Sequence, residues 1–562
     1  LSAFTGCRLR FILRPTSIYS TLLEKLRHPE YLRDGADRGL EIEVLARAAV
    51  TKPQAQEVGI PWSVYQSEAR AIERGDVPHF DAWPLSKRLS AEGSPITEDF
   101  FEETPLSRVR RRLASLSDDD LTAQVALLGA IHARFDSSSH GTSGGATQET
   151  QCGPSLGHAD FISEAVGIGE AIQSRAIQGS DGCINWISIF DDPETDRLRL
   201  EPLGYTFYNG RCGVATFLAT LSEISGRSDF RDSAVAAVSP LLGATAFLKH
   251  RLHRLGIGGG AGTGGIVYGL ARVAEALNDQ EVLDSSVRIA EAISLDHVGQ
   301  DRTYDVIAGT AGGILGLLAL YRHVPKQSIL DRAVACGQHL LAHRSQSGNG
   351  YKVWSSAVSS RSLTGFSHGA AGIALALLRL WQATACSDYR GAAEEAIAFE
   401  TATYSPAHRN WPDFRSSDST TGDSAPFLKT WCHGAPGIGL ARVAGLPYLA
   451  TSQVYADIEA ALSTTLETSE TGPDHLCCGH AGRIDFLISA GLALNRPALL
   501  GEAVSRMSSV VRRKCATGQY MLRTDLAAGW SCPVFFQGLA GVGYQLLRTA
   551  IPEKVPSALS WE

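Results

Sequence analysis

Three cysteines stand at corresponding places in two neighbouring segments of the chain. Cys432 follows a tryptophan and precedes a His-Gly dipeptide, and the pair Cys477-Cys478 precedes a Gly-His dipeptide. Segments of the same design stack side by side in repeat proteins, so we expect the three thiols to meet. Soft thiolates in a tetrahedral arrangement favour Zn2+. The sequence therefore predicts a zinc site made by Cys432, Cys477 and Cys478.

The chemistry of this site depends on whether a fourth protein ligand is present. Three ligands and an open position are typical of catalytic zinc, whereas His433 or His480 as a fourth ligand would make the site structural. An open site with three thiolates is a weak Lewis acid but keeps a substrate thiol ionised, which predicts addition or transfer at a substrate thiolate. Two simpler interpretations are inert buried cysteines and a vicinal disulfide between Cys477 and Cys478.

A histidine and an aspartate precede two earlier segments of the same type. His368 stands in Gly-Phe-Ser-His-Gly, and Asp305 stands four residues before a glycine. At the rim that carries the thiols, His368 is a candidate general acid or base, and Asp305 would orient it or stabilise its imidazolium. The alternatives are a structural histidine and an aspartate that only caps its own helix.

Seven Gly-x-x-Gly turns, each followed by an apolar helix, would position these side chains. The turns recur at intervals of about 45 to 65 residues, which suits one helical hairpin and its loops per repeat. A helix that is apolar on nearly every side must be buried all round. The glycine pairs are Gly210/Gly213, Gly262/Gly265, Gly309/Gly312, Gly369/Gly372, Gly434/Gly437, Gly479/Gly482 and Gly538/Gly541.

Stacked hairpins of this kind predict an all-α fold that closes into a barrel of two rings. The glycine-led helices would form the inner ring, and their more polar partners would form the outer ring. If the inner helices run parallel, all seven turns lie at one end. Glycine allows close backbone approach there, and the helix N-termini supply positive partial charge.

Composition sets limits on partners and location. The 562 residues carry a formal net charge of -8 and are 44% hydrophobic, so no basic field for nucleic acid is present. The sequence contains no run of about 18 apolar residues, so we expect no membrane span, and no signal peptide is evident. Eleven cysteines are too few and too irregularly placed for a disulfide scaffold. We expect a cytoplasmic protein with free thiols or metal ligands.

A Ser/Gly-rich tract at residues 136–153 predicts a flexible linker between two domains. Residues 1–135 are mainly helical and charged in pattern, and residues 154–562 contain the repeats. Before the first repeat, a helix from about Phe161 to Ile177 leads into a short β-hairpin, Ile184–Ile189 with Arg197–Leu200. A Ser/Thr/Asp-rich loop at residues 416–424 separates the fourth and fifth repeats and is predicted near the rim.

The repeat region resembles the cyclase domain of lanthionine synthetases over about residues 190–562. Its fingerprints are Gly-Phe-Ser-His368-Gly, Trp-Cys432-His-Gly-Ala-Pro-Gly and Cys477-Cys478-Gly-His-Ala-Gly-Arg. The resemblance implies an α/α toroid that binds catalytic zinc and adds a peptide cysteine thiolate to dehydroalanine or dehydrobutyrine, which forms a lanthionine or methyllanthionine ring.

The same resemblance implies roles for individual residues. Cys432, Cys477 and Cys478 would bind zinc, as in a three-thiolate variant, since many relatives have Cys-His-Gly in place of Cys-Cys-Gly. His368 would protonate the enolate, with Asp305 as its acidic partner. Some single-domain relatives carry an arginine shortly before the Trp-Cys pair, where this chain has Lys429.

The upstream region resembles the C-terminal end of the dehydration domain of class II, bifunctional lanthipeptide synthetases. The matching segments begin at Arg10, Leu32 and Glu73. The resemblance implies elimination roles for Arg10 and Thr16, and an Arg fork suits a leaving phosphate. ATP and Mg2+ would belong to a kinase-like part before Leu1, so we expect a fragment that cyclises without dehydrating. Its partner would be a precursor peptide with a leader and a core rich in Cys, Ser and Thr.

Two other functions are compatible with the residues. The toroid and its thiolate zinc would activate a small thiol such as glutathione, or the site would be structural, closed by His433 or His480, within a noncatalytic binding scaffold.

Overall fold

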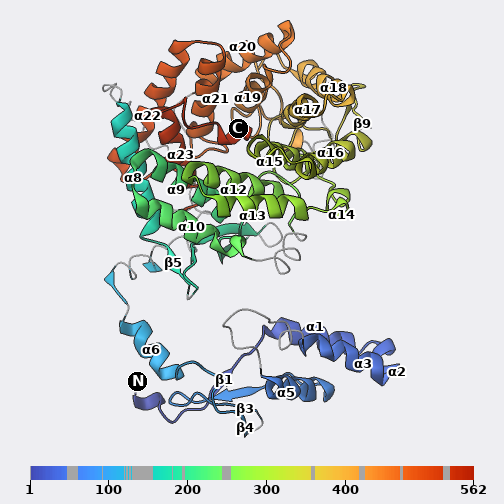
Figure 1. The fold of residues 1–562 in the computed structure, drawn as a ribbon, viewed down its shortest axis with the longest axis vertical. Helices are drawn as coiled ribbons and strands as arrows, with labels where there is room; N and C mark the ends of the chain where they lie inside the picture. The colour runs from blue at the N-terminus through green and yellow to red at the C-terminus, as the bar shows by residue number, and fades with distance from the viewer. Residues whose placement is uncertain are drawn as a thin grey trace. The chain divides into compact units, whose positions relative to one another are not determined.

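The computed structural model describes most of the chain as two compact units (Figure 1). It describes residues 2–46, 61–91, 93–114, single positions between 116 and 128, and 156–562 except 180, 193–196, 244–254, 356–360, 417–424, 469–471 and 523–531. The units are Leu1–Val125 and Ala126–Glu562. The predicted linker at residues 136–153 lies outside the described residues, as does most of the loop at 416–424.

The first unit combines short helices with a four-stranded antiparallel sheet. Its helices contain more of the described residues than its strands. The sequence does not predict the sheet, because the strands are too short for a recognisable alternation. Tyr19 and Leu26 pack in one small core, and Val64 and Phe80 pack in another. The elements are α1 (Thr16–Leu26), α2 (Pro29–Arg33), α3 (Gly35–Ile42), α5 (Trp62–Glu73), α6 (Pro105–Ala114) and strands β1 (Leu9–Phe11), β2 (Phe80–Ala82), β3 (Leu89–Ala91) and β4 (Ser94–Thr97), in the order β1-β2-β3-β4.

In the second unit, the described residues hold seven glycine-led helices that form a closed inner ring (Figure 1). Each helix packs against the next, and the last packs back against the first. Each begins directly after the first glycine of its pair. They are α9 (Arg211–Ser225), α12 (Thr263–Leu277), α15 (Thr310–His323), α17 (Ala370–Thr384), α19 (Ala435–Gly445), α21 (His480–Ala493) and α23 (Leu539–Ala550).

A second helix packs on the outside of each inner helix, so the fold is the predicted α/α toroid. The sequence predicts a helix near Phe161 ahead of the repeats. In the structure this helix, α8 (His158–Gln173), is the outer partner of α23, so the two ends of the repeat region close the ring together. The other outer helices are α10 (Ser228–Leu242), α13 (Gln280–Ala292), α16 (Gln327–Ala342), α18 (Ser387–Thr403), α20 (Ser452–Leu466) and α22 (Pro497–Thr517).

Burial differs between the two rings as the apolar pattern predicts. In α15 every residue from Thr310 to Leu320 is buried, whereas its outer partner α16 buries residues at helical spacing, such as Ile329, Ala333 and Leu340. The predicted β-hairpin is also present, as β7 (Ile187–Asp192) antiparallel to β8 (Arg197–Pro202). Within the described ranges, no helix is both long and apolar enough to cross a lipid bilayer.

Both glycines of each pair are required by close approach of the backbone. A Cβ on the second glycine would overlap the carbonyl oxygen six residues earlier, as at Gly312 with Val306 and at Gly437 with Trp431. A Cβ on the first glycine would overlap the backbone of the same turn, as at Gly309 with Asp305. The glycine pattern is therefore a property of the turn itself, independent of any chemistry at the rim.

Smaller elements complete the second unit. They are β5 (Ile177–Gln178), β6 (Ile184–Asn185), α14 (Leu295–Gly299), β9 (Ser345–Gln346) and β10 (Lys352–Val353), with 3-10 turns at Phe414–Ser416 and Ala558–Ser560.

Candidate metal centre and acid/base pair

A closed ring of backbone hydrogen bonds joins the seven turns. We call the residue two positions before the first glycine of each pair the ring position. The N–H at each ring position donates to the carbonyl at the next one around the toroid, with N to O distances of 3.0 to 3.3 Å, and the last donates to the first. The ring positions are Tyr208, Gly260, Ile307, Ser367, Cys432, Cys477 and Phe536.

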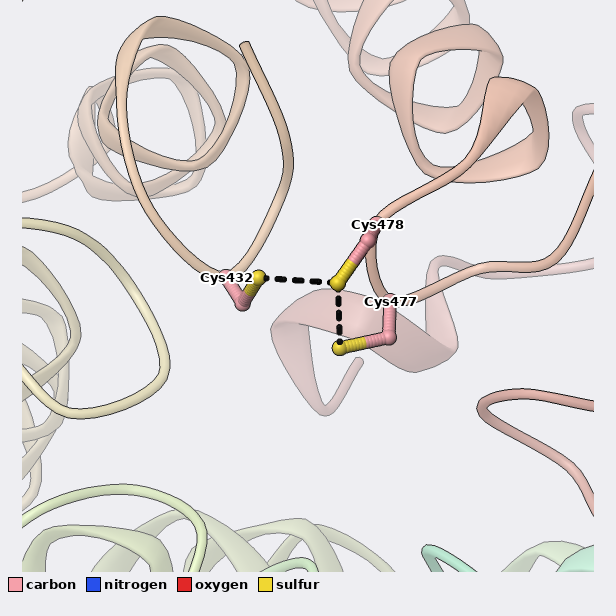
Figure 2. A group of neighbouring side chains, drawn as sticks. All are labelled: Cys432, Cys477 and Cys478. Carbon is pink, nitrogen blue, oxygen red and sulfur yellow. Dashed lines mark hydrogen bonds between the residues drawn. The ribbon is translucent and has the colours of Figure 1, made fainter. Parts of the chain in front are cut away.

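This ring brings the three cysteines together (Figure 2). Cys432 and Cys477 occupy adjacent ring positions, and Cys478 follows directly. The sulfur of Cys478 lies 3.3 Å from that of Cys432 and 3.5 Å from that of Cys477, and all three lie within 4.8 Å of one another. Tetrahedral zinc with bonds of about 2.3 Å needs sulfur atoms about 3.8 Å apart. The donor set and its spacing therefore fit Zn2+.

The environment of the thiols favours one thiolate at Cys432. Hydrogen bonds from Cys477 and Cys478 lower the pKa of the Cys432 thiol well below its ordinary value, although burial acts against this. The hydroxyl of Thr430 lies 3.2 Å from the same sulfur. The hydrogen bond with Cys432 raises the pKa of Cys477, and burial adds to the rise. The pKa shifts of these two neighbouring thiols thus have opposite directions.

Neither candidate fourth ligand belongs to the cluster. Among the His, Cys, Asp and Glu side chains of the described residues, the three sulfurs form the one group close enough to share an ion. His433 Nε2 lies 3.4 Å from the hydroxyl of Ser367, and His480 Nδ1 lies 3.1 Å from Arg483 Nη2. Cys477 and Cys478 are free thiols, not a vicinal disulfide.

His368 and Asp305 form a hydrogen-bonded pair on the same rim. Nδ1 of His368 lies 2.6 Å from Oδ2 of Asp305, whose side chain is 2% exposed, while that of His368 is 26% exposed. The other carboxylate oxygen of Asp305 accepts the N–H groups of Ala308 and Gly309 at 2.7 and 3.1 Å. Asp305 thus accepts hydrogen bonds within its own turn and also lies within hydrogen-bond distance of His368, so the two interpretations of this residue do not exclude each other. The pairing at Nδ1 leaves Nε2 of His368 outside this hydrogen bond.

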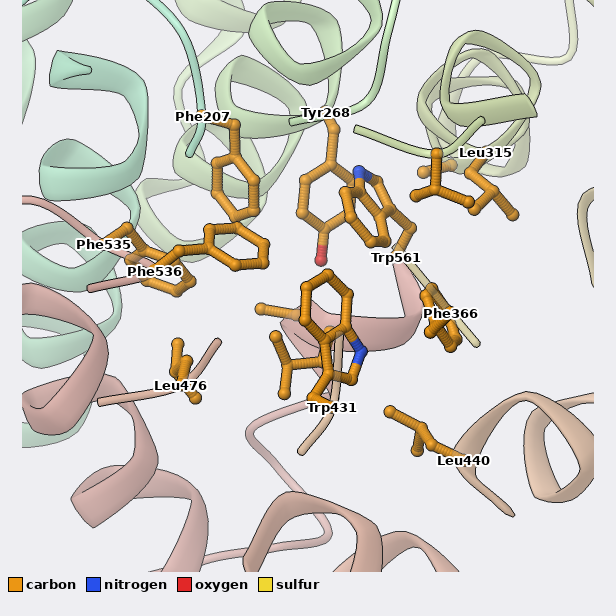
Figure 3. Close-up of a cluster of buried hydrophobic side chains, with 14 of the residues drawn as sticks. Phe207, Tyr268, Leu315, Phe366, Trp431, Leu440, Leu476, Phe535, Phe536 and Trp561 are labelled. Atoms are coloured by element: carbon orange, nitrogen blue, oxygen red, sulfur yellow. The ribbon is translucent and has the colours of Figure 1, made fainter. Parts of the chain in front are cut away.

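The residues just before the ring positions form the core beneath the site. Side chains from several repeats converge on the axis of the toroid around Trp561 (Figure 3). The indole of Trp561 donates to the carbonyl of Gly259 at 3.2 Å and lies 6.1 to 6.4 Å from the rings of Phe207, Phe366, Trp431 and Phe536. Trp431, fully buried beside Cys432, thereby fixes the turn that carries the first thiol.

Sequence reasoning missed Tyr208, which occupies the ring position of the first repeat. Its ring stacks on Phe536 with centroids 4.5 Å apart. Burial, and then the charge of Cys477 and a hydrogen bond with it, raise the pKa of the Tyr208 phenol well above its ordinary value. Aligning the seven glycine pairs would have placed Tyr208 in the same layer as Cys432 and Cys477.

Sequence reasoning also missed Asp413 and Arg415, which pair beside His433. Their Asp-x-Arg spacing is common in proteins, and no signal in the sequence separates it from a surface ion pair. Lys429, by contrast, contributes backbone: it bridges to Gly434, and its carbonyl accepts from Arg483. No hydrogen bond or ion pair joins its ammonium to another described residue.

The two candidate residues of the first unit are exposed. Arg10 lies on β1, and Thr16 is the first residue of α1. Within the described part of this unit no hydrogen bond joins them. Nearby Arg14 and Tyr19 have structural partners, since both bond the fully buried carboxylate of Glu68, at 2.7 and 2.5 Å.

Comparisons with known proteins find a family match over most of the chain. The "Lanthionine synthetase C-like protein" family matches residues 201–560, and a "Domain of unknown function (DUF4135)" matches residues 1–82. A curated relative, the lacticin 481/lactococcin biosynthesis protein LcnDR2 of Lactococcus lactis subsp. lactis, is 23% identical over 465 residues. The match covers 82% of this chain but 45% of the relative, so the chain spans about half of that protein's length.

Among solved structures, nisin cyclase is 16% identical, with a TM-score of 0.47 over 70% of this chain and 94% of its own. A GH76A alpha-1,6-mannanase from Salegentibacter sp. HEL1_6 is 11% identical, with a TM-score of 0.39 over 70% of this chain and 99% of its own. The family match, which spans well over half of the chain, decides the assignment. The chain belongs to the lanthionine synthetase C-like family.

Proposed function

We propose that this protein closes thioether rings in a peptide, adding cysteine thiolates to dehydroalanine or dehydrobutyrine to give lanthionine or methyllanthionine. The observation that carries the proposal is the cluster of three sulfurs on the rim that also holds the His368–Asp305 pair. A thiol-binding centre and a proton donor are the two parts that such an addition needs. Membership of the family supports the same reaction.

Cys432, Cys477 and Cys478 would hold a zinc ion, and the ion would supply a position at which a substrate cysteine stays ionised and nucleophilic. His433 and His480 lie outside the sulfur group, which favours an open, catalytic position over a closed, structural one. The ring of backbone hydrogen bonds holds the turns that carry the thiols.

The addition needs one proton at carbon. The substrate thiolate bonds to the β-carbon, and the electrons of the double bond move to the α-carbon and its carbonyl, which gives an enolate. His368 then delivers a proton to the α-carbon through Nε2. Asp305 accepts the N–H of Nδ1 and stabilises the imidazolium before transfer. The proton that the substrate thiol loses on ionisation balances the proton gained at carbon.

We also propose that residues 1–135 are the C-terminal part of a dehydration domain, joined through the linker at residues 136–153 to the cyclase domain at 154–562. Arg10 and Thr16 would act in phosphate elimination there, and ATP and Mg2+ would serve a kinase-like part outside this chain. The partner would be a precursor peptide with a leader and a core rich in Cys, Ser and Thr, met in the cytoplasm.

Incubation with a peptide that contains one dehydroalanine and one cysteine tests the function. We expect ring closure, seen as loss of alkylatable thiol without change of the peptide mass. Cys432→Ala should abolish closure, while Cys386→Ala, at a free thiol outside the cluster, should retain it. Consumption of added glutathione without ring closure would favour the small-thiol function instead, and no reaction of either kind would favour a structural site.

A further inference from the structure

Arg415 forms an ion pair with Asp413 near the thiol cluster, outside the sequence motifs that mark the site. Arg415 Nε and Nη2 donate to the two carboxylate oxygens of Asp413 at 3.1 and 2.8 Å. The side chain of Asp413 is 4% exposed. Its backbone N–H donates to the carbonyl of Pro426 at 2.8 Å, and the hydroxyl of Thr364 donates to that of Pro412 at 2.7 Å. The Asp413–Arg415 pair is thus fixed to the rim.

The Asp413–Arg415 pair is connected to both the thiol cluster and the His368–Asp305 pair. Oδ1 of Asp413 lies 3.8 Å from Nδ1 of His433, the residue that directly follows Cys432. The His433 ring in turn stacks on that of His368, with centroids 5.7 Å apart and planes 21° apart. Asp413, and with it the Arg415 that it binds, is therefore linked through His433 to the turn of Cys432 and to the ring of His368.

The nearby thiols affect the pKa of Arg415. Burial lowers its pKa, but its hydrogen bonds with Asp413 and then the charges of Asp413, Cys432 and Cys478 raise it above the ordinary value. Its side chain is 37% exposed, so the guanidinium is open to a ligand. Of its five N–H donors two bond Asp413, and the rest have no acceptor among the described residues.

Arg483 also lies near the thiols, but it cannot serve a substrate in the same way. It is buried, and its donors bond His480 and the carbonyl of Lys429. Burial lowers its pKa to about 10. Of these two arginines, Arg415 is the more exposed, and the charges of Cys432 and Cys478 act on its pKa.

We propose that Arg415 is a catalytic residue of ring closure, whose guanidinium donates hydrogen bonds to the carbonyl oxygen of the dehydroamino acid and stabilises the enolate formed there. This inference rests on the proposed function. When the carbon–sulfur bond forms, negative charge moves to that oxygen, close to thiolates that are already negative. A fixed cation with free donors lowers the energy of this state more than that of the neutral acceptor.

Kinetics with the zinc-loaded chain and a peptide of one dehydroalanine and one cysteine test the proposal. Arg415→Gln should lower kcat about 100-fold, as loss of one oxyanion donor does, with little change in KM, zinc content or melting temperature. Arg415→Lys should lower kcat about 10-fold, since an ammonium is a point charge without the planar fork.

Arg227 offers a matched control. It forms the same two-residue fork on Asp229, at 3.1 and 2.7 Å, and its side chain is 38% exposed. Arg227→Gln should leave kcat unchanged.

The outcomes separate this proposal from the function on which it rests. An active wild type with an equally active Arg415→Gln would overturn the proposal alone, and so would loss of zinc in that variant, which would make Arg415 part of the metal site's structure. If Arg415→Gln does not fold, a normal kcat in Arg415→Lys would overturn the proposal. A wild type that closes no ring would overturn both.

Discussion

The two sides of the toroid share one backbone and differ in their side chains. On one side, the turns from the third repeat to the sixth carry Asp305, His368, Cys432 and the Cys477-Cys478 pair. Around the rest of the ring, the ring positions hold Phe536, Tyr208 and Gly260. Tyr208 stacks on Phe536, and its phenol reaches Cys477 where the two sides meet. The hydrogen bonds are the same around the whole ring. The glycine framework therefore builds the rim, and the residue types at a few fixed positions decide where chemistry is placed on it.

Replacing a glycine of a Gly-x-x-Gly pair should have the largest effect on stability, because these glycines shape the turns on both sides of the ring. In Gly437→Ala the new Cβ would overlap the carbonyl oxygen of Trp431, and we expect a loss of about 3 kcal/mol or more in the free energy of unfolding. Gly391→Ala, in outer helix α18 with nothing within 4 Å of its Cβ, should be neutral or slightly stabilising. Denaturant unfolding of both variants measures the difference, and equal stability would contradict the role given to the glycine pairs.

Replacing a side chain on the chemical side should spare the framework and change only the reaction. His368→Asn should keep zinc and fold but lower kcat about 100-fold or more, as loss of a general acid does. Asp305→Asn keeps an oxygen to accept the N–H groups of Ala308 and Gly309, so it should keep its fold but also lower kcat, because an amide does not stabilise the imidazolium. Single-turnover ring closure measures both, and a normal rate in His368→Asn would remove this residue from the mechanism.

Changes in the first unit should have the smallest effect on ring closure. Arg10 and Thr16 are exposed in a separate compact unit, so Arg10→Ala and Thr16→Ala should close rings in a dehydrated peptide at the wild-type rate. In a full-length protein that contains the kinase-like part, the same changes should slow phosphate elimination. A loss of ring closure in either variant would show that the two units act together.

The sequence predicted the parts of the toroid that repeat. Glycine pairs and apolar helices recur seven times, and each recurrence constrains the same turn and the same buried inner helix, so the fold and the meeting of the three thiols followed from them. Neither α8 as the partner of α23 nor Trp561 on the axis could be predicted, because both depend on how distant ends of the chain meet.

Contacts that occur only once in the molecule could not be predicted from the sequence either. Arg415 and Asp413 lie close together in the chain, but their position beside His433 depends on how the segment before the fifth repeat is anchored to Thr364 and Pro426. The sheet of the first unit escaped for another reason, since strands of three or four residues carry too little alternation to recognise.

The coordination of zinc during binding of a thiol peptide tests the central claim most directly. X-ray absorption at the zinc edge should find three sulfur ligands and one oxygen in the resting protein, and four sulfur ligands once a cysteine-containing peptide is added, while Cys432→Ala should bind no stoichiometric zinc. An imidazole nitrogen in the resting site, or a coordination shell unchanged by the peptide, would contradict the account.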